Sequence, residues 1–158
     1  MAAVFASVLS LALALQSAPA ATVPSTWLGT WTMIPERSTF DANAPVKAAG
    51  QTLGISANGA ALHIAGDTVL QDGRHVRDTV DLNLSGAPQT VGDGIVASFM
   101  RIDDRSFDIV VRMSAAAPGA GVGTNRFSFS ADGRVLTETK TQTLAGTTTT
   151  SVLVFERK

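Results

Sequence analysis

The chain contains two histidines, His63 and His75, and imidazole is a common metal ligand. The Asp72-Gly73 pair predicts a two-residue hairpin turn, which sets His75 opposite Leu70. His63 then lies further along the strand, at a distance of about 23 Å for a rise of roughly 3.3 Å per residue. The two imidazoles cannot share one ion from this hairpin, so the sequence predicts no metal site.

Residues that could perform catalysis are similarly isolated. The adjacent carboxylates Asp103 and Asp104 fall in a predicted tight turn, where aspartate commonly bonds to nearby backbone. The chain has no cysteine, no tyrosine and no G-x-S-x-G motif, so no nucleophile with a neighbouring base can be assembled. The sequence therefore predicts a protein that is not an enzyme and that has no cofactor.

Three charged residues are candidates for a polar site. Arg101 shares strand parity with Phe99, so its guanidinium is expected inside an enclosed sheet or at its mouth, where it suits a carboxylate. The alternative is a solvated arginine at a strand end. A three-residue turn at 131–133 sets Arg126 directly opposite Glu138, either as an external ion pair or as a polar spot in a cavity.

These side chains are carried by a chain of short strands joined by tight turns. Residues 27–34 alternate with a period of two, which predicts a strand that Pro35 ends. Residues 35–38 suit a single helical turn, and residues 40–50 and 115–121 are expected to form loops. Further strands are predicted at 52–56, 61–70, 74–84, 89–91, 95–102, 107–113, 122–130, 134–142 and 147–157.

Several turns give definite cross-strand partners. Asn58-Gly59 is a strong two-residue hairpin signal, and residues 103–105 suit a three-residue loop. A simple register across Asp72-Gly73 separates Leu62 from Val80 onto different faces, so a bulge at Gly66-Asp67 is predicted to restore one apolar face. The predicted pairs are Ile55 with Leu62, Leu53 with Ile64, Phe99 with Ile109, and Ala97 with Val111.

This meander predicts an all-β fold, an up-and-down antiparallel β-barrel of about 8–10 strands in which the first and last strands meet. A barrel of this size can hold one small ligand. The side chains expected to contact that ligand are Leu53, Ile55, Ile64, Val76, Phe99, Arg101, Ile109, Val111 and Phe127.

The first twenty residues are typical of a secretory signal peptide. An apolar run at 4–15 precedes an A-x-A site that ends at Ala20, and the run is too short for a span of roughly twenty residues. The predicted organisation is a signal peptide at 1–20 and one barrel domain at 21–158. The mature protein is then expected to be periplasmic or secreted.

The bulk composition limits the partners. The chain has 158 residues, 45% of them hydrophobic, and this suits one globular domain. Its formal charge of −1 gives no electrostatic reason to expect nucleic acid or an acidic membrane surface as a partner.

The segments GTWTMIPERSTF, RIDDRSF, SADGRVLTETK and VFERK resemble those of small exported bacterial lipocalin-like proteins of the calycin superfamily. The resemblance implies a lipocalin or fatty-acid-binding-protein-like barrel. It also implies that Gly29 and Trp31 close one barrel end, with Arg157 of the last strand over the tryptophan ring. A guanidinium over an indole face stabilises by about 0.5–2 kcal/mol.

The sequence thus predicts an exported barrel that binds a small apolar or amphipathic molecule and has no membrane span after signal cleavage. The alternative is an envelope interaction protein whose barrel is filled by its own side chains. A small outer-membrane barrel is disfavoured because only 6% of residues are aromatic and the chain ends in Glu156-Arg157-Lys158. The pattern assigns no oligomeric state.

Overall fold

The computed structural model describes residues 22–92, 94–113 and 121–158. The predicted signal peptide at 1–20, Asp93 and all but the last residue of the predicted loop at 115–121 lie outside the described residues. No helix within the described ranges is long and apolar enough to cross a membrane. The elements are β1 (Gly29–Met33), η1 (Pro35–Arg37), β2 (Ala48–Asn58), β3 (Ala61–Leu70), β4 (His75–Asn83), β5 (Gln89–Gly92), β6 (Ile95–Asp103), β7 (Ser106–Met113), β8 (Gly121–Phe129), β9 (Val135–Leu144) and β10 (Thr147–Arg157).

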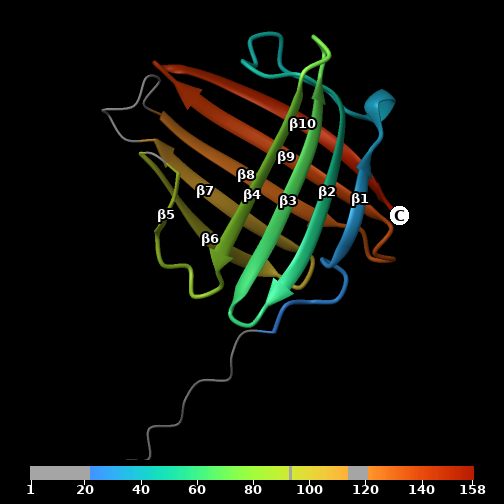
Figure 1. Ribbon diagram of the computed structural model, residues 1–158, viewed down its shortest axis with the longest axis vertical. Coiled ribbons are helices and arrows are strands. Elements are labelled where there is room, and N and C mark those ends of the chain that lie inside the picture. The colour runs from blue at the N-terminus through green and yellow to red at the C-terminus, as the bar shows by residue number, and fades with distance from the viewer. Residues whose placement is uncertain (1–21, 93, 114–120) are drawn as a thin grey trace, which may run out of the picture.

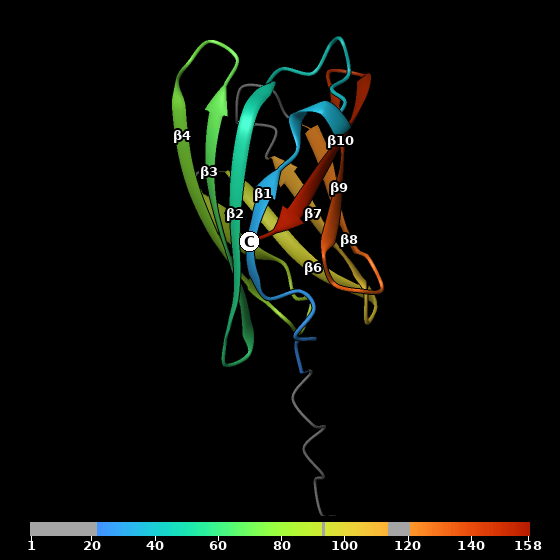
Figure 2. The same cartoon turned by 90° about the vertical axis from the view of Figure 1, so that its right-hand side faces the viewer.

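The ten strands form one antiparallel sheet in the order β4-β3-β2-β1-β10-β9-β8-β7-β6-β5. The first and last strands pair, with Trp31 opposite Arg157. The sheet curls so that β1 to β4 face β6 to β9 across a common interior (Figures 1 and 2). The predicted all-β, up-and-down antiparallel barrel is therefore confirmed, in a nearly closed form.

The barrel is incomplete between β4 and β5, which are the two ends of the strand order. The described residues form no backbone ladder between them. Instead, the carboxamide of Gln89 accepts a hydrogen bond from the backbone N–H of Asn83 at 2.9 Å and donates to the backbone oxygen of Asp81. A single side chain therefore bridges the two edges of the sheet.

The hairpin between β2 and β3 turns one residue later than predicted. Its loop consists of Gly59 and Ala60, and Gly59 takes the left-handed φ of +59° that glycine tolerates without a steric cost. Ile55 consequently lies opposite Ile64 instead of Leu62, and Leu53 lies opposite Gly66. The predicted pairs are wrong by two positions, but the apolar face is the predicted one because the parity is unchanged.

The turn between β3 and β4 holds three residues, 71–73, instead of two. Gly73 adopts a left-handed φ of +83°, and the N–H of Leu70 donates to the carbonyl of Arg74 at 2.8 Å to close the turn. The extra residue shifts the register by one, so that one apolar face forms without a bulge. The predicted bulge at Gly66-Asp67 is wrong, and the resulting pairs are Leu62 with Leu82 and Ile64 with Val80.

Two other local predictions are confirmed. Phe99 lies opposite Ile109 and Ala97 opposite Val111 in the hairpin of β6 and β7. The turn predicted after Ile34 is the 3-10 helix η1, which starts at Pro35, where a missing N–H has no cost.

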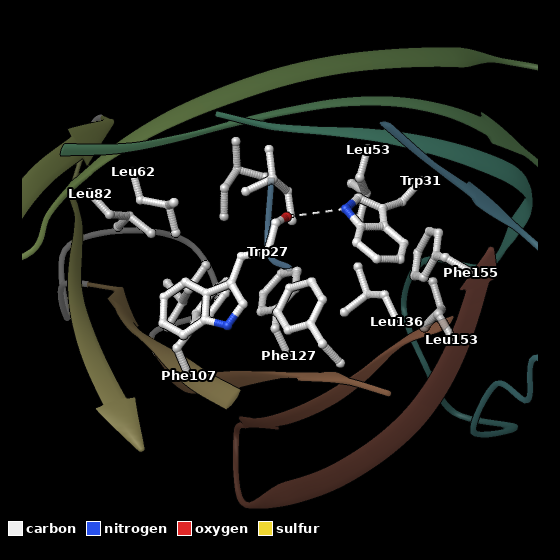
Figure 3. Packing of buried hydrophobic residues seen from close by; sticks show 14 of the residues in the cluster. Trp27, Trp31, Leu53, Leu62, Leu82, Phe107, Phe127, Leu136, Leu153 and Phe155 are labelled. Carbon is white, nitrogen blue, oxygen red and sulfur yellow. Dashed lines mark hydrogen bonds between the residues drawn. The ribbon is translucent and has the colours of Figure 1, made fainter. Parts of the chain in front are cut away.

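The core is aromatic and is concentrated around two tryptophans. Trp27 lies in a turn before β1, not in the strand where it was predicted, because its N–H bonds to the carbonyl of Pro24 at 3.0 Å. From this turn the indole enters the barrel and packs 4.7 Å from the ring of Phe107, centroid to centroid. The indole N–H of Trp31 donates to the backbone oxygen of Trp27 at 3.3 Å (Figure 3).

Candidate functional site

The barrel interior is divided along its length. The aromatic core fills the end near the two tryptophans. A cavity of about 480 Å³ occupies the other end. The loop at 41–47 and the β3–β4 turn lie at this end of the barrel (Figure 1). Ala48 and Leu153 belong both to the core and to the cavity wall, so they mark the boundary.

The cavity wall combines apolar and polar side chains. Val46 and Val76 are 60% and 43% exposed, so they lie where the cavity opens to solvent. The other apolar lining residues are Phe40, Ala44, Pro45, Ala48, Leu70 and Leu153, and the polar ones are Gln51, Thr68, Arg74, Asp78, Lys140, Gln142, Thr149 and Ser151. A pocket of this volume with a few polar groups in an apolar wall is typical of small-molecule sites, which span about 300–1,000 Å³.

Glu138 lies inside the barrel next to this cavity. The β8–β9 register places Glu138 opposite Phe127, and only 2% of its surface is exposed. Arg126 lies opposite Thr139 instead, so the predicted pairing of Arg126 with Glu138 is wrong.

The cause is a turn of four residues, 131–134, where three were predicted. The hydroxyl of Ser130 accepts hydrogen bonds from the N–H groups of Arg134 at 3.2 Å and Val135 at 2.9 Å. The backbone N–H of Ser130 then donates to the carbonyl of Val135 at 2.8 Å. One additional residue in the turn moves every side chain of β9 to the opposite face of the sheet relative to the prediction.

Arg126 has a different partner. Its guanidinium donates two hydrogen bonds of 2.8 Å to the two carboxylate oxygens of Asp108, which lies opposite it on β7. Hydrogen bonding to Asp108 and the charge of this carboxylate raise the pKa of Arg126. Arg126 is therefore held by the fork geometry of an arginine–carboxylate pair and does not line the cavity.

Lys140 and Glu138 form an ion pair within the barrel. The Lys140 ammonium nitrogen lies 3.4 Å from Oε2 of Glu138, and Lys140 also lines the cavity. Burial raises the pKa of Glu138; the charge and contact of Lys140 oppose this effect, and the negative charge of Asp78 adds to it. The carboxyl group is thus poised between a neutral form favoured by burial and an ionised form favoured by one ammonium.

Asp78 supplies a carboxylate to the wall of the cavity. It lies on β4 opposite Gly66 of β3. A methyl group in place of the Gly66 hydrogen would collide with Oδ1 of Asp78, so the glycine makes room for this carboxylate. Gly66 therefore serves close approach of a side chain, where the sequence had suggested a bulge.

The residues predicted to contact a ligand are mostly elsewhere in the barrel. Of the nine, Val76 lines the cavity. Val111 packs against the aromatic core, and six residues belong to that core: Leu53, Ile55, Ile64, Phe99, Ile109 and Phe127. These side chains point inward as expected, but Trp27 and its aromatic neighbours fill the space that they enclose (Figure 3).

Arg101 lies at the tryptophan end of the barrel. Its guanidinium carbon is 5.4 Å from the centroid of the Trp27 ring. The same group donates to the backbone oxygen of Thr22 at 3.0 Å and to Oδ1 of Asp104 at 2.5 Å. Arg101 therefore contacts the outer side of the aromatic core and does not line the cavity.

The three residues assigned to barrel closure meet at one place. The guanidinium carbon of Arg157 lies 4.4 Å from the centroid of the Trp31 ring. Gly29 has a φ of +134°, which side chains rarely adopt, and a Cβ there would come within 3.1 Å of the Arg157 guanidinium. Glycine thus leaves room for the arginine beside the first strand.

The two histidines have separate carboxylate neighbours. Nδ1 of His63 is 2.8 Å from Asp81, and Nδ1 of His75 is 3.7 Å from Asp67. His75 lies opposite Val69, not opposite Leu70 as predicted, because of the longer β3–β4 turn.

Comparison with known proteins gives a fold likeness only. No protein-family model matches the chain, and no curated protein matches it. One similar solved structure is the zebrafish ileal bile acid-binding protein complexed with cholic acid, at 14% identity and a TM-score of 0.49, covering 85% of this chain and 100% of that one. Another is EF1p2_mFAP2b bound to DFHBI, at 9% identity and a TM-score of 0.48, covering 86% of this chain and 97% of that one.

Proposed function

We propose that this protein binds a small amphipathic molecule in the cavity at the open end of its barrel. The observation that carries the proposal is the composition of a cavity of about 480 Å³, whose wall combines apolar side chains with the charged groups of Arg74, Asp78 and Lys140. The role is binding, and the cavity residues act by shape, hydrogen bonding and charge.

The arrangement suggests an orientation for the ligand. Val46 and Val76 are exposed apolar residues at the opening, and covering them removes apolar surface from water. Lys140 and Asp78 lie on strands β9 and β4, which other strands separate on both sides of the barrel. The polar group of the ligand is therefore expected to lie between these two walls, with its apolar part against the two valines.

A blocked cavity tests this proposal. Thr68 lines the cavity, whereas Thr79 is an exposed residue of β4 outside the lining. We expect Thr68→Trp to weaken calorimetric binding of decanol by at least about tenfold, and Thr79→Trp to leave it unchanged. Binding of decanol to the wild-type protein that is insensitive to Thr68→Trp would place the ligand elsewhere and overturn the proposal.

The filled half of the barrel supports a second candidate, an interaction protein that works through its surface. Under this alternative the wild-type protein binds no apolar probe, and native mass spectrometry of the purified protein shows the mass of the chain alone. Under the binding proposal a co-purified or added small molecule remains attached in the same measurement.

We also propose that the protein is exported and that residues 1–20 are removed. The support is the apolar run and the A-x-A site ending at Ala20. Mass spectrometry of the protein recovered from an expressing cell is expected to show a chain that begins at Ala21. Recovery of the full chain with its first residues intact would contradict export by this route.

A further inference from the structure

The buried polar atoms without partners near the cavity are both hydrogen-bond acceptors. Oε2 of Glu138 and Oε1 of Gln51 are buried, and neither has a hydrogen-bond partner among the described residues. The 3.4 Å contact of Glu138 with Lys140 is an ion pair without hydrogen-bond geometry. Buried acceptors of this kind are stabilised when a donor reaches them, so a ligand group that carries N–H or O–H donors suits them.

The charges around the cavity favour a cation as that group. Arg74 is paired with Asp72 at 2.7 Å, so its charge is matched outside the cavity. Asp78, Glu138 and Lys140 remain, which are two carboxylates and one ammonium. Asp78 forms no ion pair within the described part of the chain, so one negative charge at the cavity lacks a counter-ion.

The two carboxylates approach the cavity from different walls. Asp78 lies on β4, and Glu138 lies on β9; strands β3, β2, β1 and β10 separate them in the sheet. Asp78 shares its face of β4 with the inward-facing Val80 and Leu82, and Glu138 is buried on the inner face of β9, so both carboxyl groups face the common interior. A small cation between them can interact with both.

We propose that the ligand is an amphipathic amine, whose ammonium group lies between Asp78 and Glu138 and whose apolar part lies against Val46 and Val76; this inference rests on the proposed function. An ammonium group has three donors and no acceptor, which matches the unpartnered oxygens. Bound there, it supplies the missing counter-ion of Asp78, while Lys140, whose side chain is 37% exposed, retains access to solvent.

The same site disfavours an anionic ligand. A carboxylate head group meets the negative charge of Asp78 and the buried carboxyl group of Glu138, and the ammonium of Lys140 is already engaged by Glu138. Like charges at short range in a partly buried site are costly. A neutral alcohol offers one donor and no charge, so its affinity is expected to lie between those of the amine and the carboxylate.

A head-group series with one common tail tests the inference. Decylamine, decyltrimethylammonium, decanol and decanoate are titrated into the wild-type protein at neutral pH and followed by calorimetry. Decylamine is expected to bind at least about tenfold more tightly than decanol, because hydrogen bonds to charged groups are the stronger ones. The trimethylammonium probe has the charge but no N–H donor, so it is expected to bind more weakly than decylamine.

Isosteric variants locate the effect. Asp78→Asn and Glu138→Gln are each expected to lower the affinity for decylamine by about tenfold and to leave the affinity for decanol nearly unchanged. Asp81→Asn is the matched control, because Asp81 is an exposed carboxylate on the same strand that pairs with His63 at 2.8 Å. It is expected to leave all four affinities unchanged, and circular dichroism confirms folding of each variant.

The outcomes separate this inference from the proposed function. Equal affinity for the four head groups, a preference for decanoate, or a trimethylammonium probe as tight as decylamine overturns the amine assignment while cavity binding stands. An affinity for decylamine that neither Asp78→Asn nor Glu138→Gln changes also overturns the amine assignment while cavity binding stands. Failure of every probe to bind the wild-type protein overturns both.

Discussion

Arg157 lies over the ring of Trp31, with 4.4 Å between its guanidinium carbon and the ring centroid. The same guanidinium donates hydrogen bonds to the backbone oxygens of Gly133 at 2.7 Å, Leu28 at 2.7 Å and Thr26 at 2.6 Å. One side chain thus joins the end of β10, the β8–β9 turn and the turn that carries Trp27. This contact holds the closed end of the barrel together.

Arg157→Ala is therefore expected to lower the free energy of unfolding by on the order of 2–3 kcal/mol, because a cation–π contact and several charged hydrogen bonds are lost together. Arg157→Lys is expected to lower the free energy of unfolding by more than half as much as Arg157→Ala, since an ammonium cannot reproduce the planar fork of N–H donors of a guanidinium. Urea unfolding measures both. Arg112→Ala, at an exposed arginine of β7, is the control, and an Arg157 effect no larger than this control would contradict the role.

Replacement of the Trp31 ring is expected to lower the free energy of unfolding by more than replacement of Arg157 does. Trp31 is fully buried in the core, so Trp31→Ala removes a large side chain and leaves a cavity, at a cost of about 3–5 kcal/mol. The comparison is made by urea unfolding under the same conditions. A loss below about 1 kcal/mol would show that the ring does not seal this end.

Gln89 offers a test of the gap between β4 and β5. Gln89→Ala removes the acceptor for the Asn83 N–H and the donor to the Asp81 carbonyl. Because these bonds are exposed, the stability loss is expected to be small, about 0.5–1 kcal/mol. The sharper readout is hydrogen exchange of the Asn83 amide, which should accelerate in Gln89→Ala but less in Gln89→Glu, which keeps an acceptor. Unchanged exchange in Gln89→Ala would mean that another group protects this amide.

The sequence was sufficient for the strand order and for registers that depend on a correctly sized turn. The pairing of Phe99 with Ile109 followed from alternation and loop length, whereas the meeting of Trp31 with Arg157 was implied by the resemblance to lipocalin-like barrels. Where a turn held one residue more than predicted, the register of the following strand shifted by one: at 71–73 this made the predicted bulge unnecessary, and at 131–134 it moved the side chains of β9 to the other face. Successive side chains of a strand point to opposite faces of the sheet, so a shift of one residue in the register always moves each side chain to the other face.

The polar half of the interior could not be recognised from the pattern. Residues 137–143 read TETKTQT, so both faces of β9 are polar and hydrophobicity does not indicate which one is inside. The turn length alone directs Glu138 and Lys140 inward and leaves Thr143 to bond with Thr148 at 2.9 Å on the other face. The apolar residues chosen as ligand contacts were inward-facing, but the sequence did not show that Trp27 would leave its strand and fill the space between them.

Glu138→Gln is expected to stabilise the protein at neutral pH. Burial raises the pKa of Glu138 above its ordinary value of 4.5, so the folded protein keeps this proton to a higher pH than the unfolded chain does. The stability that this carboxyl contributes is fully present below about pH 4.5 and is lost as the pH rises through its folded-state pKa. Glutamine does not titrate, so the variant avoids that loss.

The difference between the unfolding free energies of Glu138→Gln and wild type is accordingly expected to be more favourable to the variant at about pH 8 than at about pH 4. Urea unfolding across this range measures it, and Glu156→Gln, at an exposed glutamate of β10, is the matched control with no such trend. A difference that stays constant with pH would mean that the carboxyl titrates alike in both states. A difference that grows in favour of wild type at high pH would mean that the ammonium of Lys140 outweighs the cost of burial, and that the interior is built around an ionised carboxylate.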